Sequence, residues 1–178
     1  MAYGVIEKVA VRAQSIDALN RSVESATLLE NGNAFNLATM GTIANREEEV
    51  WVATTPASGS LTDLWMLAED PVVVTDSKYR NLDPDPRDYT LAIGTTGSAF
   101  KPEVGDLIRG NADSMVGTKS TNTFVNATDS AFQLTWGATQ TASVLSFVIR
   151  QTQYMSIGLG TLGTQRITAY LFECLAVR

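Results

Sequence analysis

The feature that most constrains the fold is a succession of short segments in which apolar and polar residues alternate. Phe132–Trp136 alternates strictly, and Leu145, Phe147 and Ile149 repeat the pattern. A period of two places one set of side chains on a buried face and the other toward water, as in antiparallel sheets. Such segments recur between turn-forming residues at intervals of about 8–12 residues, which is typical of sandwiches and barrels. The sequence therefore predicts a mainly β fold, an antiparallel sandwich or barrel of one or two small β units.

The other expected strands are short and rich in valine, threonine and aromatic residues, which favour strands. Asp83-Pro84-Asp85-Pro86 predicts a rigid loop, because each proline fixes its own φ and restricts the residue before it. A polar stretch from Gly110 to Asn122 is a candidate boundary between two β units. We therefore expect a β-rich domain over residues 31–178, with a subdivision near 110–122. Its expected strands are 35–37, 50–53, 64–67, 72–75, 89–93, 107–109, 123–125, 132–136, 144–154 and 167–177.

The first 30 residues have a different pattern. Residues 5–12 alternate and indicate a strand or an extended arm. Ile16, Leu19 and Val23 recur at helical spacing, and Ser15 is a suitable N-cap, so the pattern predicts one short helix over 15–28. Asn31-Gly32-Asn33 is a strong turn signal that ends it. Residues 1–30 are thus expected to form an N-terminal arm and a short helix.

Composition limits the protein class. With 44% hydrophobic and 18% charged residues in 178, the chain is too apolar to be disordered. Its longest apolar stretches have the length of strands, so we expect no membrane span. The N-terminus lacks the features of a secretory signal, and a single cysteine fits a reducing compartment. We therefore expect the chain to be made in a cytoplasm.

Charge argues against nucleic acid as a partner. The net charge is −6, and the 13 Lys and Arg residues are scattered singly along the chain. Proteins bind nucleic acids largely by neutralising phosphates with clustered Lys and Arg. We expect no nucleic-acid binding.

The absence of histidine argues against catalysis. The chain has no histidine, which is the usual general base near neutral pH and the commonest metal ligand. Cys174 is the only cysteine, so a structural zinc site with Cys and His ligands has too few donors. We interpret Cys174 as a small buried apolar residue in the last strand. The chain is expected not to be an enzyme, with no cofactor and no metal.

Three motifs resemble ligand sites. Gly158–Gly163 matches the dinucleotide fingerprint G-x-G-x-x-G, but the 15 residues after it leave no space for a βαβ unit, so a glycine-rich hairpin is expected. Gly117–Ser120 resembles the end of a phosphate loop, but a threonine precedes the lysine, which favours a turn. Asp83, Asp85 and Asp88 are a candidate calcium loop or a solvated acidic loop.

The three tryptophans allow two interpretations. Trp51, Trp65 and Trp136 lie in expected strands with apolar neighbours. Core packing is the simpler interpretation, and a sugar-binding or subunit-contact patch is the alternative.

The order of five segments in the first two thirds of the chain is similar to that of a known family. Asn31–Leu37 is followed by Glu49–Pro56, Leu64–Leu67, Glu69–Val73 and Val104–Ile108. This order, within residues 28–110, resembles small proteins encoded near the major capsid protein of tailed bacteriophages, the capsid decoration or cement proteins. The residues after Asn122 carry no part of the resemblance.

The resemblance implies a virion structural protein on the outside of an icosahedral capsid, where it cements neighbouring major capsid protein subunits. The implied partners are the major capsid protein and further copies of the chain, as a homotrimer. An extended arm adds affinity by pairing with a sheet edge of its partner through main-chain hydrogen bonds. The expected capsid contacts lie in this arm: Tyr3, Val5, Ile6, Lys8, Val9 and Arg12. Two alternatives remain, a tail, baseplate or fibre module and a carbohydrate-binding module.

Overall fold

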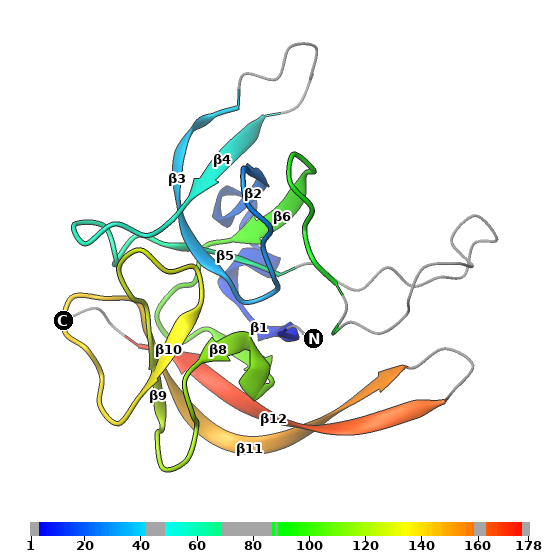
Figure 1. Cartoon of the computed structure of the whole chain (residues 1–178). Coiled ribbons are helices and arrows are strands. Elements are labelled where there is room, and N and C mark those ends of the chain that lie inside the picture. The colour runs from blue at the N-terminus through cyan, green and yellow to red at the C-terminus, as the bar shows by residue number, and fades with distance from the viewer. Residues whose placement is uncertain (1–3, 42–48, 69–86, 88, 159–162, 176–178) are drawn as a thin grey trace.

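The computed structural model describes residues 4–41, 49–68, 87, 89–158 and 163–175. The regular structure of these residues is almost entirely β and forms two sheets (Figure 1). The prediction of a mainly β fold of barrel- or sandwich-like units is confirmed, since one sheet is a closed barrel and the other is an open, curved sheet. None of the described helical segments has the length and apolar character needed to cross a membrane.

The barrel closes through one long-range strand pair. β2, the first strand of the barrel, pairs with β4 in parallel and with β6, the last strand, in antiparallel register, and the β2–β6 pair closes the barrel. The spatial order is β2-β4-β3-β5-β6. The strands are β2 (Asn20–Ser25), β3 (Ala34–Met40), β4 (Val50–Thr54), β5 (Trp65–Leu67) and β6 (Gly97–Phe100).

The second sheet has seven strands in the order β1-β7-β12-β11-β9-β10-β8. Its neighbouring strands are antiparallel except for β8 and β10, which are parallel. A long hairpin, β11–β12, forms its centre and runs along the bottom of Figure 1. The strands are β1 (Ile6–Ala10), β7 (Leu107–Gly110), β8 (Met115–Val116), β9 (Phe124–Asn126), β10 (Leu134–Gly137), β11 (Ser146–Gly158) and β12 (Thr164–Cys174).

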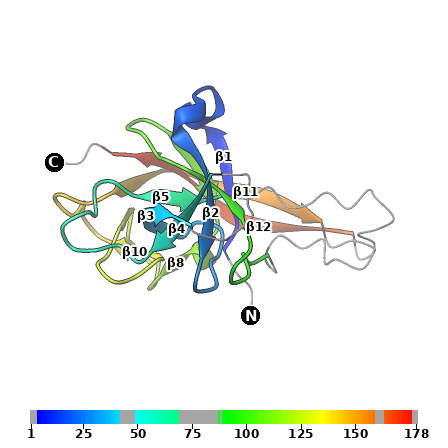
Figure 2. The same cartoon turned by 90° about the horizontal axis from the view of Figure 1, so that it is seen from above.

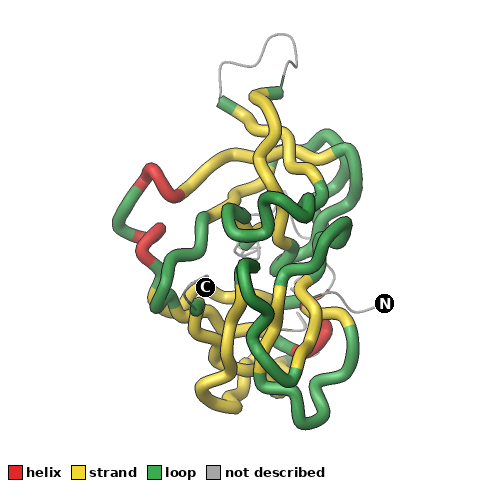
Figure 3. The backbone as a smooth tube through the Cα atoms, turned by 90° about the vertical axis from the view of Figure 1, so that its left-hand side faces the viewer, coloured by secondary structure: helices red, strands yellow, loops and turns green. Residues whose placement is uncertain are grey.

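The prediction of a helix over residues 15–28 is wrong. In its place lie the 3-10 turn η2 (Asp17–Leu19) and strand β2, preceded by a second turn, η1 (Arg12–Gln14). The helical spacing of the apolar residues is overridden because β2 has a hydrogen-bonded neighbour on each side in the barrel, and Val23 is fully buried there. Figure 3 shows helical segments only as such short turns, of which η5 (Ala112–Ser114) is another.

Other strand predictions differ in detail. Strands β6 and β8 were not expected, and within residues 89–93 only Leu91 forms a bridge, with Leu29. The expected strand 72–75 and the loop 83–86 lie outside the described residues. The remaining predicted strands overlap observed ones.

A shared core joins the two sheets. Its largest cluster contains Ala34, Met66 and Phe100 from the barrel together with Phe147 and Phe172 from the open sheet. A second cluster fills the barrel around Phe35 and a third, small one surrounds Val5. Barrel and sheet therefore pack against each other through this largest cluster.

The chain also weaves the two sheets together. Residues 1–30 supply β1 to the open sheet and β2 to the barrel. The chain then completes the barrel and returns at β7 to the sheet in which it began. Within 110–122, η5 and β8 lie beside the other strands of the open sheet.

Candidate interaction surfaces

The six residues expected to contact a capsid fall into two groups. Val5 and Ile6 are 5% exposed and belong to the protein's own core clusters. Lys8 is half-buried, whereas Val9 and Arg12 are exposed. Tyr3 lies outside the described residues. Only the far end of this segment therefore presents side chains to a partner.

The described part of the arm is an edge strand. β1 pairs with β7 on one side, and no strand in the described part of the chain pairs with the other. The backbone N–H of Asn111 donates to the carbonyl of Val5 at 3.2 Å, so the backbone groups of Val5 face β7. Backbone groups alternate in direction along a strand, which directs those of Ile6 and Lys8 away from β7.

Hydrogen bonds and an ion pair fix this edge. Asn111 Oδ1 accepts from the backbone N–H of Val5 and from the Ser114 hydroxyl, both at 2.9 Å. Glu7 and Arg109 face each other across β1 and β7 and form an ion pair at 2.5 Å. Both side chains are partly exposed, so the pair adds at most about 1 kcal/mol. These contacts hold β1 in one register.

A β-bulge and a turn shape the end of the edge. The pairing of β1 shifts between Lys8 and Ala10, which leaves Val9 as the extra residue, 43% exposed. Asp106 is buried, and its carboxylate accepts the backbone N–H groups of Arg12 at 3.1 Å and Glu103 at 2.9 Å. A shallow groove of about 390 Å³ lies between residues 10–14 and 104–106, beside the 50% exposed Val104.

The second exposed feature is the outer half of the β11–β12 hairpin. β11 pairs with β9 only at residues 146–148, and β12 pairs with β7 only at 170–173. Beyond these residues the two strands pair only with each other in the described chain. Figure 2 shows them running out past the labelled strands of the rest of the molecule.

The two faces of the outer hairpin differ. Met155 and Ala169 are buried on one face, next to Val5. The opposite face is exposed, and we call it the hairpin face: Thr152, Tyr154, Ser156, Arg166 and Thr168. On it the Arg166 guanidinium stacks on Tyr154, 3.8 Å from the ring centroid. Phe172 lies on the same side of the sheet, where it packs against the barrel. The barrel does not extend over the outer hairpin, so the hairpin face is exposed.

Charge is unevenly divided along the chain. Residues 130–172 contain no acidic residue and two arginines, Arg150 and Arg166. The rest of the chain has 11 Lys and Arg residues and all 19 acids. Arg150 forms an ion pair with Glu173, whereas Arg166 has no acidic partner in the described chain. The hairpin is therefore the cationic part of an acidic protein.

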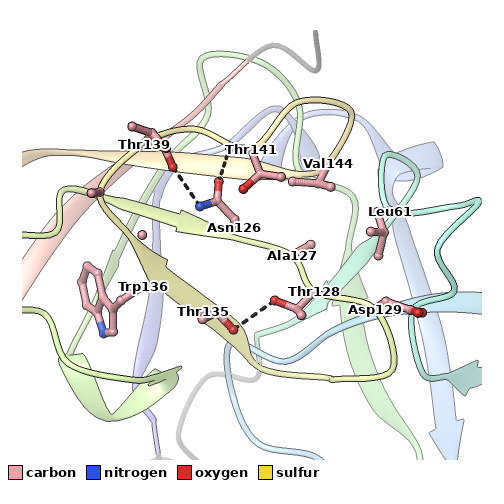
Figure 4. Close-up of a pocket in the computed structure, with 12 residues that line it drawn as sticks. Leu61, Asn126, Ala127, Thr128, Asp129, Thr135, Trp136, Thr139, Thr141 and Val144 are labelled. Carbon is pink, nitrogen blue, oxygen red and sulfur yellow. Dashed lines mark hydrogen bonds between the residues drawn. The ribbon is translucent and has the colours of Figure 1, made fainter.

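A cavity of about 400 Å³ with both polar and apolar side chains in its lining lies at the opposite end of the sheet (Figure 4). Asn126 lies at its wall, where its Nδ2 donates to the Thr139 carbonyl at 3.1 Å. Its Oδ1 accepts from the Thr141 N–H at 3.0 Å and the Ser146 hydroxyl at 2.7 Å. Thr128 donates to Thr135 at 3.0 Å across the cavity. Asn126 thus holds the loop between β10 and β11, and the Thr128–Thr135 bond holds the connection between β9 and β10, so these polar groups are already engaged within the protein.

The tryptophans mostly pack in the core. Trp65 and Trp136 are 9% and 7% exposed, and Trp136 packs against Tyr170 and Phe172 with ring centroids 5.9 Å away in each case. Trp51 is half-buried in β4 and packs against the barrel core. Two of the three rings thus follow the core interpretation.

Cys174 is buried in β12, as predicted. Burial raises the pKa of its thiol from the ordinary value of 9.0 to about 12, and the nearby carboxylates of Asp106 and Glu103 act in the same direction. A thiol with so high a pKa is neutral at physiological pH and unsuited to nucleophilic chemistry. Among the described residues, no group of three or more acidic or cysteine side chains is placed to hold a metal ion.

The described residues of the two glycine motifs lie at a hairpin end and in a turn. Gly158 and Thr164 are paired at the end of the β11–β12 hairpin, and Gly163 has a φ of +94°, which glycine adopts readily. Antiparallel strands on both sides exclude the strand–helix geometry of a dinucleotide site. Gly117 also has a positive φ, and Lys119 extends over the ring of Tyr170, 5.4 Å from its centroid. The acidic residues 83, 85 and 88 lie outside the described residues.

Comparison of the chain with protein-family models, with curated proteins and with solved structures found no match.

Proposed function

We propose that the chain is a virion structural protein that binds the outside of an icosahedral phage capsid and cements neighbouring major capsid protein subunits. The observation that carries the proposal is the open edge of β1. Its outward backbone groups are available for pairing, and exposed Val9, Arg12 and Val104 lie beside them. An added strand gains affinity from main-chain hydrogen bonds and specificity from side chains at the edge.

The shape of the molecule supports a role in protein contacts. A rigid β core presents an edge strand and a protruding hairpin, which are suited to lie across more than one neighbouring subunit. Several modest contacts made together raise the overall affinity, because the first contact increases the effective concentration of the next. The buried Trp65 and Trp136 give no support to a carbohydrate-binding module, which needs exposed aromatic rings.

The test is co-sedimentation with expanded capsids that were assembled without the protein. The wild-type chain should bind, and Lys8→Pro should bind at least about tenfold more weakly, since it removes an N–H that points out from the edge while the β7 pairing remains. Lys8→Ala is the matched control, because it removes the same side chain and keeps the N–H.

Two outcomes would contradict the proposal at different levels. If the wild-type chain does not bind capsids at all, the proposed function is wrong. If the wild-type chain and both variants bind equally, the shell contact does not use the β1 edge. Circular dichroism and urea unfolding of Lys8→Pro that match those of the wild-type chain establish that the fold is retained.

A further inference from the structure

We propose that the outer edge of β12, at residues 164–168, binds an extended segment of another protein in which acidic and apolar residues alternate. The segment adds a strand to the hairpin and places a carboxylate beside Arg166. The proposal goes beyond the shell contact at β1 and does not depend on it, because it concerns a different edge of the sheet.

The first argument is the direction of the backbone groups along β12. The N–H of Cys174 donates to the carbonyl of Asp106, which precedes β7, at 2.9 Å, so the backbone groups of Cys174 point to the β7 side. This direction alternates along a strand, and the register shift of the hairpin falls in β11 and not in β12. The backbone groups of Arg166 and Thr168 therefore point to the same side. β7 pairs with β12 only at residues 170–173, and no described strand takes its place beyond them.

An open edge of this kind is suited to an extended polypeptide. Each outward N–H and C=O group finds a partner on the main chain of an added strand. The free stretch at residues 164–168 spans about 17 Å, which is the length of an ordinary strand. A nucleic acid has no alternating N–H and C=O groups along its backbone, so it cannot extend the sheet in this way.

The second argument is the charge beside this edge. Arg166 stacks on the exposed ring of Tyr154 and forms no ion pair in the described chain. Residues 130–172 contain no acidic residue that could neutralise it. An arginine stacked on an aromatic ring keeps its planar donors for two-point binding of a carboxylate. The residue opposite Arg166 in an added strand would have its Cβ about 4.5–5.5 Å away on the same face, so an acidic residue fits there.

The third argument is the difference between the two faces of β12. Ile167 is half-buried on the face opposite the hairpin face, where it packs against Val5, Met155 and Ala169. The side chains of an added strand alternate in the same way as those of β12. One set lies beside Arg166, and the other set continues the apolar layer at Ile167. A segment with alternating acidic and apolar residues therefore matches both faces.

The experiment measures the binding of a fluorescent ten-residue peptide of alternating Glu and Val to the full chain by anisotropy. The wild-type chain should bind this peptide, and the affinity should fall as salt is raised. The same peptide with Lys in place of Glu should bind at least about tenfold more weakly. Amide hydrogen exchange of Arg166 and Thr168 should slow in the complex, because their N–H groups become hydrogen-bonded.

Variants at Arg166 separate the charge from the backbone. Arg166→Gln should weaken binding about tenfold, because the carboxylate loses its partner. Arg150→Gln is the matched control, since it makes the same change at an exposed arginine of the other strand, and it should bind as the wild-type chain does. Arg166→Pro should bind about fivefold more weakly than Arg166→Ala, because it also removes the outward N–H.

Several results would overturn the proposal. They are no binding of the Glu peptide by the wild-type chain, equal binding of the Glu and Lys peptides, and equal losses in the two Gln variants. Unchanged exchange at Arg166 and Thr168 in the complex would place the peptide elsewhere, and this measurement on the wild-type chain keeps the test decisive if Arg166→Pro folds poorly. Tighter binding of a ten-nucleotide oligothymidylate would assign the edge to nucleic acid, and self-association that Arg166→Gln abolishes would assign it to a second copy.

Discussion

Single residues fix the N-terminal segment against the sheet. A Cβ atom added to Gly4 would lie 2.5 Å from the Cα of Ser114, so the backbones approach more closely than any other residue permits. The same contact brings Val5 to the buried side chain of Asn111, which accepts its N–H. Close packing at Gly4 and this hydrogen bond together determine where the edge strand begins.

Cys174 gives a pH-dependent stability whose direction follows from its pKa. The folded-state value of about 12 lies above the ordinary 9.0 of an unfolded chain, so the folded state holds its proton more tightly. The resulting contribution of the Cys174 thiol to the free energy of unfolding is complete below pH 9 and is lost as the pH rises toward 12. Cys174→Ala should remove this part of the alkaline loss.

The measurement is urea unfolding of the wild-type chain and of Cys174→Ala between pH 8 and pH 12. The difference between their free energies of unfolding isolates Cys174, because the other groups titrate equally in both proteins. The thiol of the folded wild-type chain should also resist Ellman's reagent at pH 8 and react on unfolding. Equal pH profiles, or rapid reaction in the folded state, would show that Cys174 is not buried as described.

At the scale of elements, long-range pairing decides which segments become strands. Gly97-Ser98-Ala99-Phe100 has little strand preference of its own, yet it forms β6 because β2 and β5 pair with it on either side. The same barrel closure converts the helical pattern of residues 20–25 into β2. Turn elements depend instead on single polar side chains, such as Asn126 in the β10–β11 connection.

Replacing Asn126 by alanine should loosen that connection. The substitution leaves the Thr141 N–H without its acceptor and the Ser146 hydroxyl with only the more distant Val144 carbonyl, and we expect a loss of about 2 kcal/mol in the free energy of unfolding. Asn122→Ala is the control, because its side chain makes one exposed bond to the Thr118 carbonyl and its loss should cost less than about 0.5 kcal/mol. Equal losses in chemical denaturation would contradict the assigned role of Asn126.

At the scale of the whole molecule, the shared core makes barrel and sheet interdependent. Phe100 of the barrel and Phe172 of the sheet are both 1% exposed or less and belong to one cluster. The chain crosses between the sheets after β1 and again before β7. Neither sheet can lose its partner without exposing this interior.

We therefore expect a single cooperative unfolding transition. In Trp136→Phe, the remaining tryptophans report on the barrel, while the reactivity of Cys174 reports on the open sheet. Both signals should change at one urea concentration, and Phe100→Ala should lower that concentration for both, with a cost of about 3–5 kcal/mol. Two separated transitions would mean that the sheets fold as independent units.

The sequence by itself determined the β character, most strand positions and the burial of Cys174. These follow from local properties, because alternation such as that of Phe132–Trp136 reports directly which side chains face a core. It also located Val9 and Arg12, the predicted contacts that prove exposed.

Only the tertiary structure decided the barrel, the absence of the expected helix and the exposure of the hairpin face. β2 and β6 meet across more than 70 intervening residues, and no local pattern encodes that pairing. Val5 and Ile6, predicted as contacts, became core residues because β7 and β12 complete the sheet around them. Tyr154 and Arg166 look like ordinary strand residues in the sequence, and they become a surface because the barrel ends before it reaches them.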